Sequence, residues 1–265
     1  MDLNLTSKVA FVTGASKGIG REVATRLARE GCDVVVTARG AEDLEKAAAA
    51  IATDTGRKVV AQAGDMSQSS DVDRCVQAAL DEFGRIDILV TCAGSSPGGL
   101  LEELTDEQWM ESLNLKFMGY VRTVRAVVPH MAERGSGAIV LVVGNDGLKP
   151  SYWEMTAGAA NAADLNFASS IADQYGPQGV RVNTVNPGPV DTDRWDGLEK
   201  AFARDMGVDQ AEARRRAEAS IPLGAITQPQ EVAALVAFLA SDVARSVHGA
   251  HVPIDGAQRK PLMER

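Results

Sequence analysis

Short apolar runs alternate with amphipathic stretches along the whole chain. Seven runs have the continuous hydrophobicity of strands buried on both faces, and they cover 8–13, 33–38, 58–63, 86–91, 138–143, 180–186 and 250–255. Apolar residues recur at helical spacing over 18–30, 41–54, 69–83, 106–134, 156–176 and 229–241. This alternation predicts an α/β fold: a single Rossmann-type, doubly wound parallel sheet of about seven strands, with helices on both faces.

Length and composition agree with one globular domain. The 265 residues contain 45% hydrophobic and 24% charged residues, and no linker, low-complexity tract or internal repeat is visible. We therefore expect a single domain over residues 1–265. The segment from Pro187 to Pro222 is long and carries Trp195, Phe202 and Met206, which look exposed.

The net charge of −9 argues against a nucleic-acid or anionic-membrane partner. The run Arg214–Arg216 is flanked by Glu212 and Glu218, which favours a solvated helix face. The three cysteines show neither an even count nor paired metal spacing, so neither a disulfide framework nor a metal site is expected. The N-terminus lacks the apolar core of a signal peptide and no run approaches transmembrane length, so we expect a cytoplasmic setting.

A glycine-rich turn follows the first apolar run. Glycines at 14, 18 and 20 permit a tight turn and a close approach of the backbone to a ligand at the start of the next helix. Amide N–H groups at a helix N-terminus bind phosphate well. The spacing differs from G-x-G-x-x-G, and an ordinary strand–helix turn is the alternative, but the position after an N-terminal strand favours pyrophosphate binding.

The end of the second apolar run indicates which dinucleotide is bound. An acidic residue there would bind both ribose hydroxyls, but the chain has Thr37, Ala38 and Arg39, with Lys17 nearby in the glycine turn. Two cations and no carboxylate favour a 2′-phosphate, hence NADP(H) over NAD(H). The alternative is that Lys17 and Arg39 are only solvated surface charges.

Together these motifs resemble the short-chain dehydrogenase/reductase superfamily. The resemblance rests on TGxxxGxG at 13–20, Asp65-Met66, Ala93-Gly94, Asn114 and Asn186-Pro187-Gly188, and it extends from Lys8 to about Asp255. It implies a small-molecule substrate, a substrate lid at about 189–222 and a homodimer or homotetramer. For the lid, apolar packing between subunits or onto the main domain is the alternative. The cofactor-binding positions that it implies are Gly14, Ser16, Lys17, Gly18, Ile19, Gly20, Arg39, Asp65, Met66, Ala93, Gly94, Asn161, Pro187, Gly188 and Thr192.

The resemblance also implies a catalytic serine, tyrosine and lysine, which this chain lacks. Gly144 ends the fifth-strand pattern, where family members carry the serine. The tyrosine and lysine positions, thirteen and seventeen residues further on, hold Ala157 and Asn161. Asn161 could still bind the nicotinamide ribose, but it has no charge with which to lower the pKa of a neighbour.

Few residues could replace the missing proton donor. Asn114 matches the family's fourth catalytic position, where it looks like the residue that bends a helix; a purely structural role is the alternative. Tyr152, Asp146 and Glu154 lie in the loop after the fifth strand, where strand ends gather ligands. An apolar pocket could raise the pKa of either carboxyl group enough for acid–base catalysis; otherwise these are solvated loop charges. The remaining tyrosines, at 120 and 175, are expected to lie too far from the nicotinamide.

Three hypotheses follow. In the first, the protein is an NADP(H)-dependent oxidoreductase that acts on a small carbonyl or alcohol with a non-standard proton donor. In the second, it is a non-redox enzyme: an aldol-type lyase, a dehydratase or an isomerase. In the third, it is a catalytically inactive nucleotide-binding subunit. Fold alone does not choose among them. The phosphate cradle and the cationic ribose pocket favour the first. Under the second hypothesis, the small residues Gly144 and Ala157, at the family's serine and tyrosine positions, would leave an emptied corner and so widen the pocket.

Overall fold

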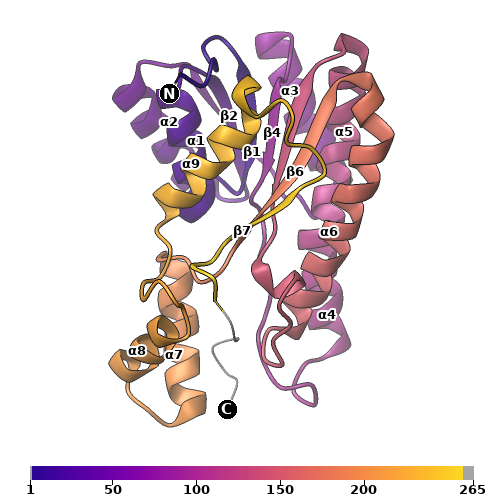
Figure 1. Cartoon of the computed structure of the whole chain (residues 1–265). Helices are drawn as coiled ribbons and strands as arrows, with labels where there is room; N and C mark the ends of the chain where they lie inside the picture. Colours follow the sequence, from indigo (N-terminus) through magenta and orange to yellow (C-terminus); the bar gives the residue numbers. More distant parts are fainter. Residues whose placement is uncertain (1, 259–265) are drawn as a thin grey trace.

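The computed structural model describes residues 2–258 and contains one parallel sheet of seven strands (Figure 1). The strands are β1 Val9–Thr13, β2 Asp33–Ala38, β3 Val59–Ala63, β4 Ile88–Thr91, β5 Gly137–Val142, β6 Val180–Pro187 and β7 His251–Ile254. Their order is β3-β2-β1-β4-β5-β6-β7, and every neighbouring pair is parallel. The predicted doubly wound fold is confirmed, with strand boundaries within two residues of those predicted.

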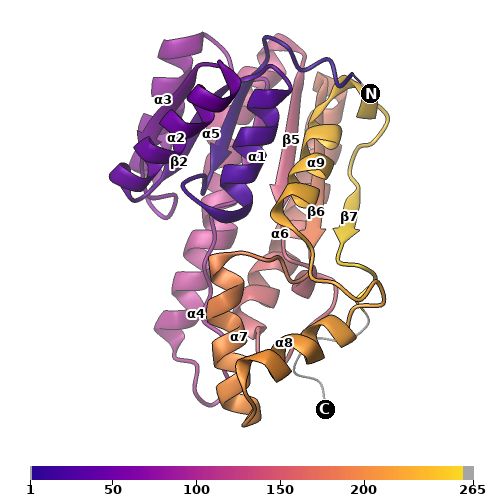
Figure 2. The ribbon, with the colours of Figure 1, turned by 90° about the vertical axis from the view of Figure 1, so that its left-hand side faces the viewer.

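Helices cover both faces of the sheet. The principal ones are α1 Gly18–Arg29, α2 Ala41–Thr55, α3 Ser69–Phe83, α5 Met118–Arg134, α6 Met155–Tyr175 and α9 Pro229–Ala240. One apolar core contains residues of α1, α2 and α9, and the other contains residues of α3, α5 and α6. Figures 1 and 2 show these two helical layers on opposite sides of the strands. The strands are buried on both faces because each apolar run packs against both layers.

The chain reverses its direction of winding between β1 and β4, which pair side by side in the middle of the sheet. Connections leave these two strands toward opposite sides, so a crevice forms at their carboxyl ends. The Thr13 hydroxyl accepts hydrogen bonds from the amides of Cys92 and Ala93, at 3.0 and 3.1 Å. These bonds fix the glycine turn beside the loop after β4.

The predicted helix over 106–134 is interrupted. It consists of α4 Asp106–Ser112, a π-helical turn Leu113–Phe117, and α5. Asn114 lies inside the π turn, as its expected role in bending a helix would require. The extra residue of a π turn rotates the following side chains around the helix axis, and such turns are frequent at functional sites.

Two further helices occupy the long segment after β6. They are α7 Asp193–Met206 and α8 Gln210–Ala219, and they project below the carboxyl ends of the strands (Figure 2). The sequence prediction that Trp195 and Phe202 look exposed is wrong, since only 5% and 2% of their surface is accessible. Both pack in an apolar cluster with Trp153, whose ring centre lies 4.7 Å from that of Phe202.

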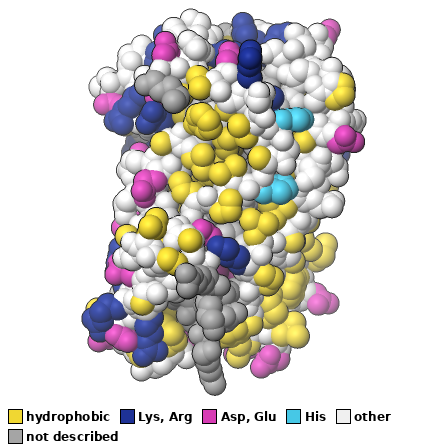
Figure 3. All heavy atoms as spheres, viewed as in Figure 1, with side chains coloured by type: hydrophobic (Ala, Val, Ile, Leu, Met, Phe, Trp, Pro, Cys, Tyr) yellow, Lys and Arg dark blue, Asp and Glu magenta, His cyan; other side chains and the backbone are white. Residues whose placement is uncertain are grey.

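The rest of the described surface adds two observations. Among residues 2–258, no helix has the length and apolar character needed to cross a membrane. Hydrophobic side chains form a band over the face on which α9, β7 and α6 lie (Figure 3). Leu235 and Phe238 of α9 are among the partly buried apolar residues that pack against the core.

Candidate active site

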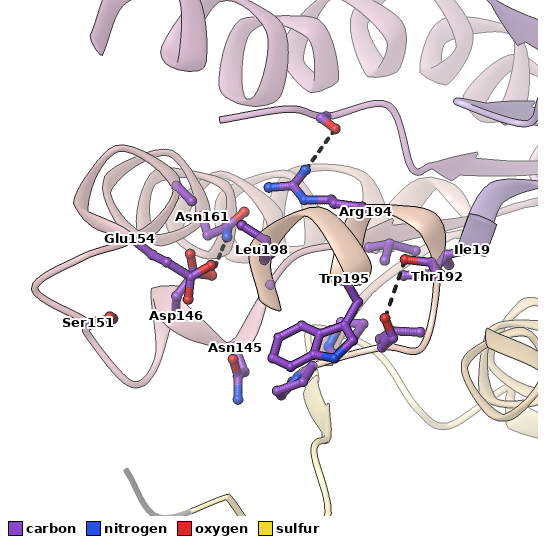
Figure 4. Close-up of a pocket in the computed structure, with 18 of the residues that line it drawn as sticks. Ile19, Asn145, Asp146, Ser151, Glu154, Asn161, Thr192, Arg194, Trp195 and Leu198 are labelled. Atoms are coloured by element: carbon purple, nitrogen blue, oxygen red, sulfur yellow. Dashed lines mark hydrogen bonds between the residues drawn. The ribbon is translucent and has the colours of Figure 1, made fainter. Parts of the chain in front are cut away.

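A pocket opens at the carboxyl ends of the strands, between the sheet and α7 (Figure 4). Its walls come from the loops after β4, β5 and β6, from the π turn, and from α6 and α7. The structure brings many of the residues predicted for the site together here. Those lining the pocket are Ile19, Gly94, Gly144, Asp146, Glu154, Ala157, Asn161, Pro187, Gly188 and Thr192.

An amide–carboxylate pair lies at the position where the family resemblance implies a serine. The side-chain amide of Asn161, on α6, donates a hydrogen bond to the Asp146 carboxylate, which lies in the short 3₁₀ turn Asn145–Gly147. A Cβ atom added to Gly144 would lie 2.5 Å from Asp146 Oδ1 and 2.7 Å from Asn161 Nδ2. The expectation of an emptied corner is therefore wrong next to Gly144, because the Asp146–Asn161 pair occupies that space.

Glu154 is the ionisable group best suited to move a proton in this pocket. It precedes the first turn of α6, and Figure 4 shows its carboxyl group beside that of Asp146. Burial raises the pKa of Glu154 to about 7, and the negative charge of Asp146 adds to the effect. A carboxylic acid with this pKa is half protonated near neutral pH and can act as general acid or base.

Lys116 also reaches this pocket, and the sequence reasoning missed it. The residue lies in the π turn, only 8% of its surface is accessible, and its aliphatic stem passes over Gly94. Burial lowers its pKa, an effect that the charge of Asp146 opposes. Its position two residues after Asn114 was the only available signal, because an isolated lysine in an amphipathic helix normally faces solvent.

Arg194 contributes a second cation at the edge of the pocket. It lies in the first turn of α7, and its Nη1 donates a 3.2 Å hydrogen bond to the carbonyl oxygen of Gly94. Figure 4 shows this bond joining α7 to the loop after β4. Lys116 and Arg194 therefore meet at the same glycine.

One tyrosine that was expected to be remote lines the pocket, and two of the predicted catalytic residues lie outside its lining. Tyr120, expected to be remote, lines the pocket; its hydroxyl donates to Val142 O at 2.7 Å, and burial raises its pKa well above the ordinary range. Tyr152 is 42% exposed and is not among the residues that line the pocket. The side chain of Asn114 accepts a 2.7 Å hydrogen bond from Arg122 and also lies outside the lining.

A second carboxyl group is buried behind the pocket. Asp164, one turn after Asn161 on α6, is fully buried, and neither of its oxygens has a hydrogen-bond partner within residues 2–258. Burial raises the pKa of Asp164 to about 8, against the opposing charge of Lys116. It is therefore predominantly protonated and uncharged at pH 7.

The glycine turn has the shape of a phosphate cradle. Gly14 and Gly18 have φ angles of +68° and +57°, and a Cβ on Gly14 would lie 2.8 Å from the backbone of Ala93. Helix α1 has no side-chain cap and no acidic residue in its first turn. Its N-terminal amides are therefore available to an anion.

Further residues are predicted to bind the nucleotide. Thr192 lies against Gly18, and the Asp65 carboxylate accepts a 2.9 Å hydrogen bond from the Ser67 amide. Ser16 and Lys17 line a second cavity, between α1 and α2. Lys17 and Arg39 are exposed, and neither forms an ion pair with another residue of the described chain. The residues present thus fit a dinucleotide with an additional phosphate.

Comparisons with known proteins identify the family to which this fold belongs. A family model described as short chain dehydrogenase matches residues 8–202. An uncharacterized NAD-dependent oxidoreductase of Mycobacterium tuberculosis is 35% identical over 268 residues, covering 95% of this chain and 96% of that protein.

Two solved structures extend the likeness to nearly the whole fold. L-Sorbose reductase from Gluconobacter frateurii, complexed with NADPH and L-sorbose, has a TM-score of 0.92 and 32% identity, covering 98% of this chain and 100% of that one. A variant of actinorhodin polyketide ketoreductase with NADPH has a TM-score of 0.92 and 31% identity, covering 95% and 97% of the two chains. This chain belongs to the short-chain dehydrogenase family.

Proposed function

We propose that the protein is an NADP(H)-dependent carbonyl reductase in which Glu154 is the proton donor. The observation that carries the proposal is the position of Glu154 in the pocket with Gly144, Ala157 and Asn161. Its pKa of about 7 lets it hold a proton at neutral pH and release it to a stronger base.

The proposed chemistry is reduction of a carbonyl to an alcohol. NADPH supplies a hydride to the carbonyl carbon when it is bound. As negative charge develops on the substrate oxygen, Glu154 transfers its proton there and becomes a carboxylate. Protonation from solvent then restores the acid. The charge of Asp146, which Asn161 holds by a hydrogen bond, raises the proton affinity of Glu154, so that about half of Glu154 carries its proton near pH 7.

The choice of NADP(H) rests on charges around the adenosine ribose. The end of β2 offers Thr37, Ala38 and Arg39 and no carboxylate, and Lys17 lies in the adjoining turn. Arg39 and Lys17 are exposed cations that a 2′-phosphate would pair with. Two NADPH-bound relatives support this choice, although the Mycobacterium tuberculosis relative is described as NAD-dependent.

Other expectations remain part of the proposal. We propose that residues 189–222 form a substrate lid, since Trp195, Leu198 and Phe202 of α7 line the pocket. We also propose a homodimer or homotetramer, in which the apolar band of Figure 3 would be covered. A cytoplasmic location and the lack of nucleic-acid and membrane partners stay predictions from the sequence.

The experiment compares two replacements of the proton donor. Purified protein is incubated with a panel of ketones and aldehydes, and the oxidation of NADPH or NADH is followed together with alcohol formation. We expect Glu154→Gln to lower the rate on the best substrate by about 10²–10⁴. Tyr152→Phe is the matched control and should leave the rate within about threefold of wild type.

The opposite pattern would transfer the donor role to Tyr152. Equal rates in the wild type and both variants would exclude Glu154 and Tyr152 as the proton donor. Product formation without any change in the nicotinamide would support the non-redox alternative.

A further inference from the structure

The pocket contains an ammonium group that the protein itself leaves unpaired. Among residues 2–258, the Nζ atom of Lys116 has no hydrogen-bond or ion-pair partner. Only 8% of the residue's surface is accessible. The Nζ atom is not among the fully enclosed polar atoms that lack a partner, so it keeps contact with the open pocket, but a charge on a largely buried side chain still gains from a partner. The position of Lys116 in the pocket wall indicates that its partner is a ligand.

A second cation faces the same place. Lys116 and Arg194 both contact Gly94: the Lys116 stem covers this glycine, and Arg194 donates a hydrogen bond to its carbonyl oxygen. Arg194 has no carboxylate partner among the described residues either, and its remaining guanidinium donors are available. The positive charge of Arg194 disfavours the charged form of Lys116, so each cation would gain from an anion placed between them.

The acidic groups of the pocket do not supply this anion. Asp146 accepts a hydrogen bond from the amide of Asn161, and Glu154 is the residue to which we assign proton donation. The remaining lysine of the lining, Lys149, forms an ion pair with Asp255. By formal charge, Lys116 and Arg194 outweigh Asp146 whenever Glu154 carries its proton, and the pocket is then net positive.

We infer that the substrate is a small oxo acid whose carboxylate binds between Lys116 and Arg194. The inference rests on the proposed reductase function, because it assigns the substrate class of that same site. The aromatic wall formed by Trp195 and Phe202 would receive the apolar part of the molecule. A bidentate guanidinium contact together with an ammonium contact is a strong arrangement for a carboxylate in a partly desolvated site.

Binding of non-reacting probes tests this inference without requiring turnover. Calorimetric titrations with pentanoate and pentanamide are performed on the free protein and on its NADP⁺ complex. We expect pentanoate to bind at least tenfold more tightly than pentanamide. Lys116→Met should abolish this preference, and Arg194→Met should reduce it at least fivefold. Lys200→Met, at an exposed position of the same helix α7, is the charge-matched control and should preserve it.

Each contrary result has a defined meaning. Equal affinities for pentanoate and pentanamide in the wild type, or an unchanged preference in Lys116→Met, would overturn the inference. The inference would also be overturned if Arg194→Met bound NADP⁺ more weakly but kept its preference for pentanoate. Arg194 would then bind the nucleotide and not the substrate carboxylate.

Failure of the reductase proposal has a separate signature. The protein could fail to oxidise NADPH with any substrate and still bind pentanoate more tightly than pentanamide, with this preference lost in Lys116→Met. That result would support the anion site and reject only the reductase proposal. Thermal unfolding of each variant shows that it is folded. Lys116→Met should not be less stable than wild type, because it removes a charge from a largely buried side chain that has no ion-pair partner among residues 2–258.

Discussion

The carboxyl group of Asp164 should make the stability of this protein depend on pH in a defined window. It is fully buried without a hydrogen-bond partner among the described residues, and its pKa rises from 3.8 to about 8 because of burial. Between these two values the native state holds a proton that the unfolded state releases. The native state therefore binds more protons, and stability falls as pH rises. Below pH 4 both states are protonated and this contribution is fully present.

The size of the effect follows from linkage. One pH unit within the window corresponds to about 1.4 kcal/mol, so Asp164 should cost the native state about 2–3 kcal/mol between pH 5 and pH 7. Asp164→Asn removes the ionisation and preserves the shape of the side chain. The difference in unfolding free energy between the variant and wild type should therefore grow by this amount in favour of the variant.

Urea unfolding at pH 5, 6, 7 and 8 measures this difference directly. Asp173→Asn, at an exposed position of the same helix α6, is the matched control, and its difference from wild type should change by less than about 0.5 kcal/mol over the same range. Parallel stability curves for wild type and Asp164→Asn would show that Asp164 ionises normally in the native state. That result would refute the description of this carboxyl group as buried and uncharged.

Two further predictions concern α7–α8 and the Asp146–Asn161 pair. Arg214→Met should lower the free energy of unfolding by about 1–2 kcal/mol, because Arg214 is the ion-pair partner of the buried Glu199. Adding Glu199→Gln should recover part of this loss in chemical denaturation; a double variant no more stable than the single one would contradict the pairing. Gly144→Ser should lower turnover on the order of 10²-fold, since its Cβ would displace Asp146 or Asn161. A faster Gly144→Ser enzyme would mean that the pair does not fill this position.

The sheet and the phosphate cradle could be predicted from the sequence because local patterns determine them. A strand buried on both faces requires a continuous apolar run, and the turn after β1 requires glycine where φ is positive, as at Gly14 and Gly18. The positions of Gly144, Asp146, Glu154 and Asn161 around one pocket could be anticipated for a related reason. The first three lie in the segment between β5 and α6, and Asn161 lies near the start of α6. The carboxyl ends of parallel strands share one edge of the sheet.

The contributions of Lys116 and of α7–α8 could not be predicted in this way. Lys116 lies in a π turn that interrupts the long helix, and its side chain lines the pocket. No residue type in Leu113–Phe117 is specific for a π turn, so the sequence did not predict it. Trp195 and Phe202 looked exposed because their burial depends on Trp153, more than forty residues away in the chain. Tertiary contacts of this kind leave no local periodicity in the sequence.

The central claim is that Glu154 delivers the proton during hydride transfer from NADPH. The most direct measurement is the pH dependence of single-turnover NADPH oxidation on the best substrate, in wild type and in Glu154→Gln. The wild-type rate should fall as pH rises through about 7, because the acid must be protonated. The Gln variant should be slower by about 10²–10⁴ and should show no step near pH 7. A Gln variant that keeps both the rate and the step would contradict the claim.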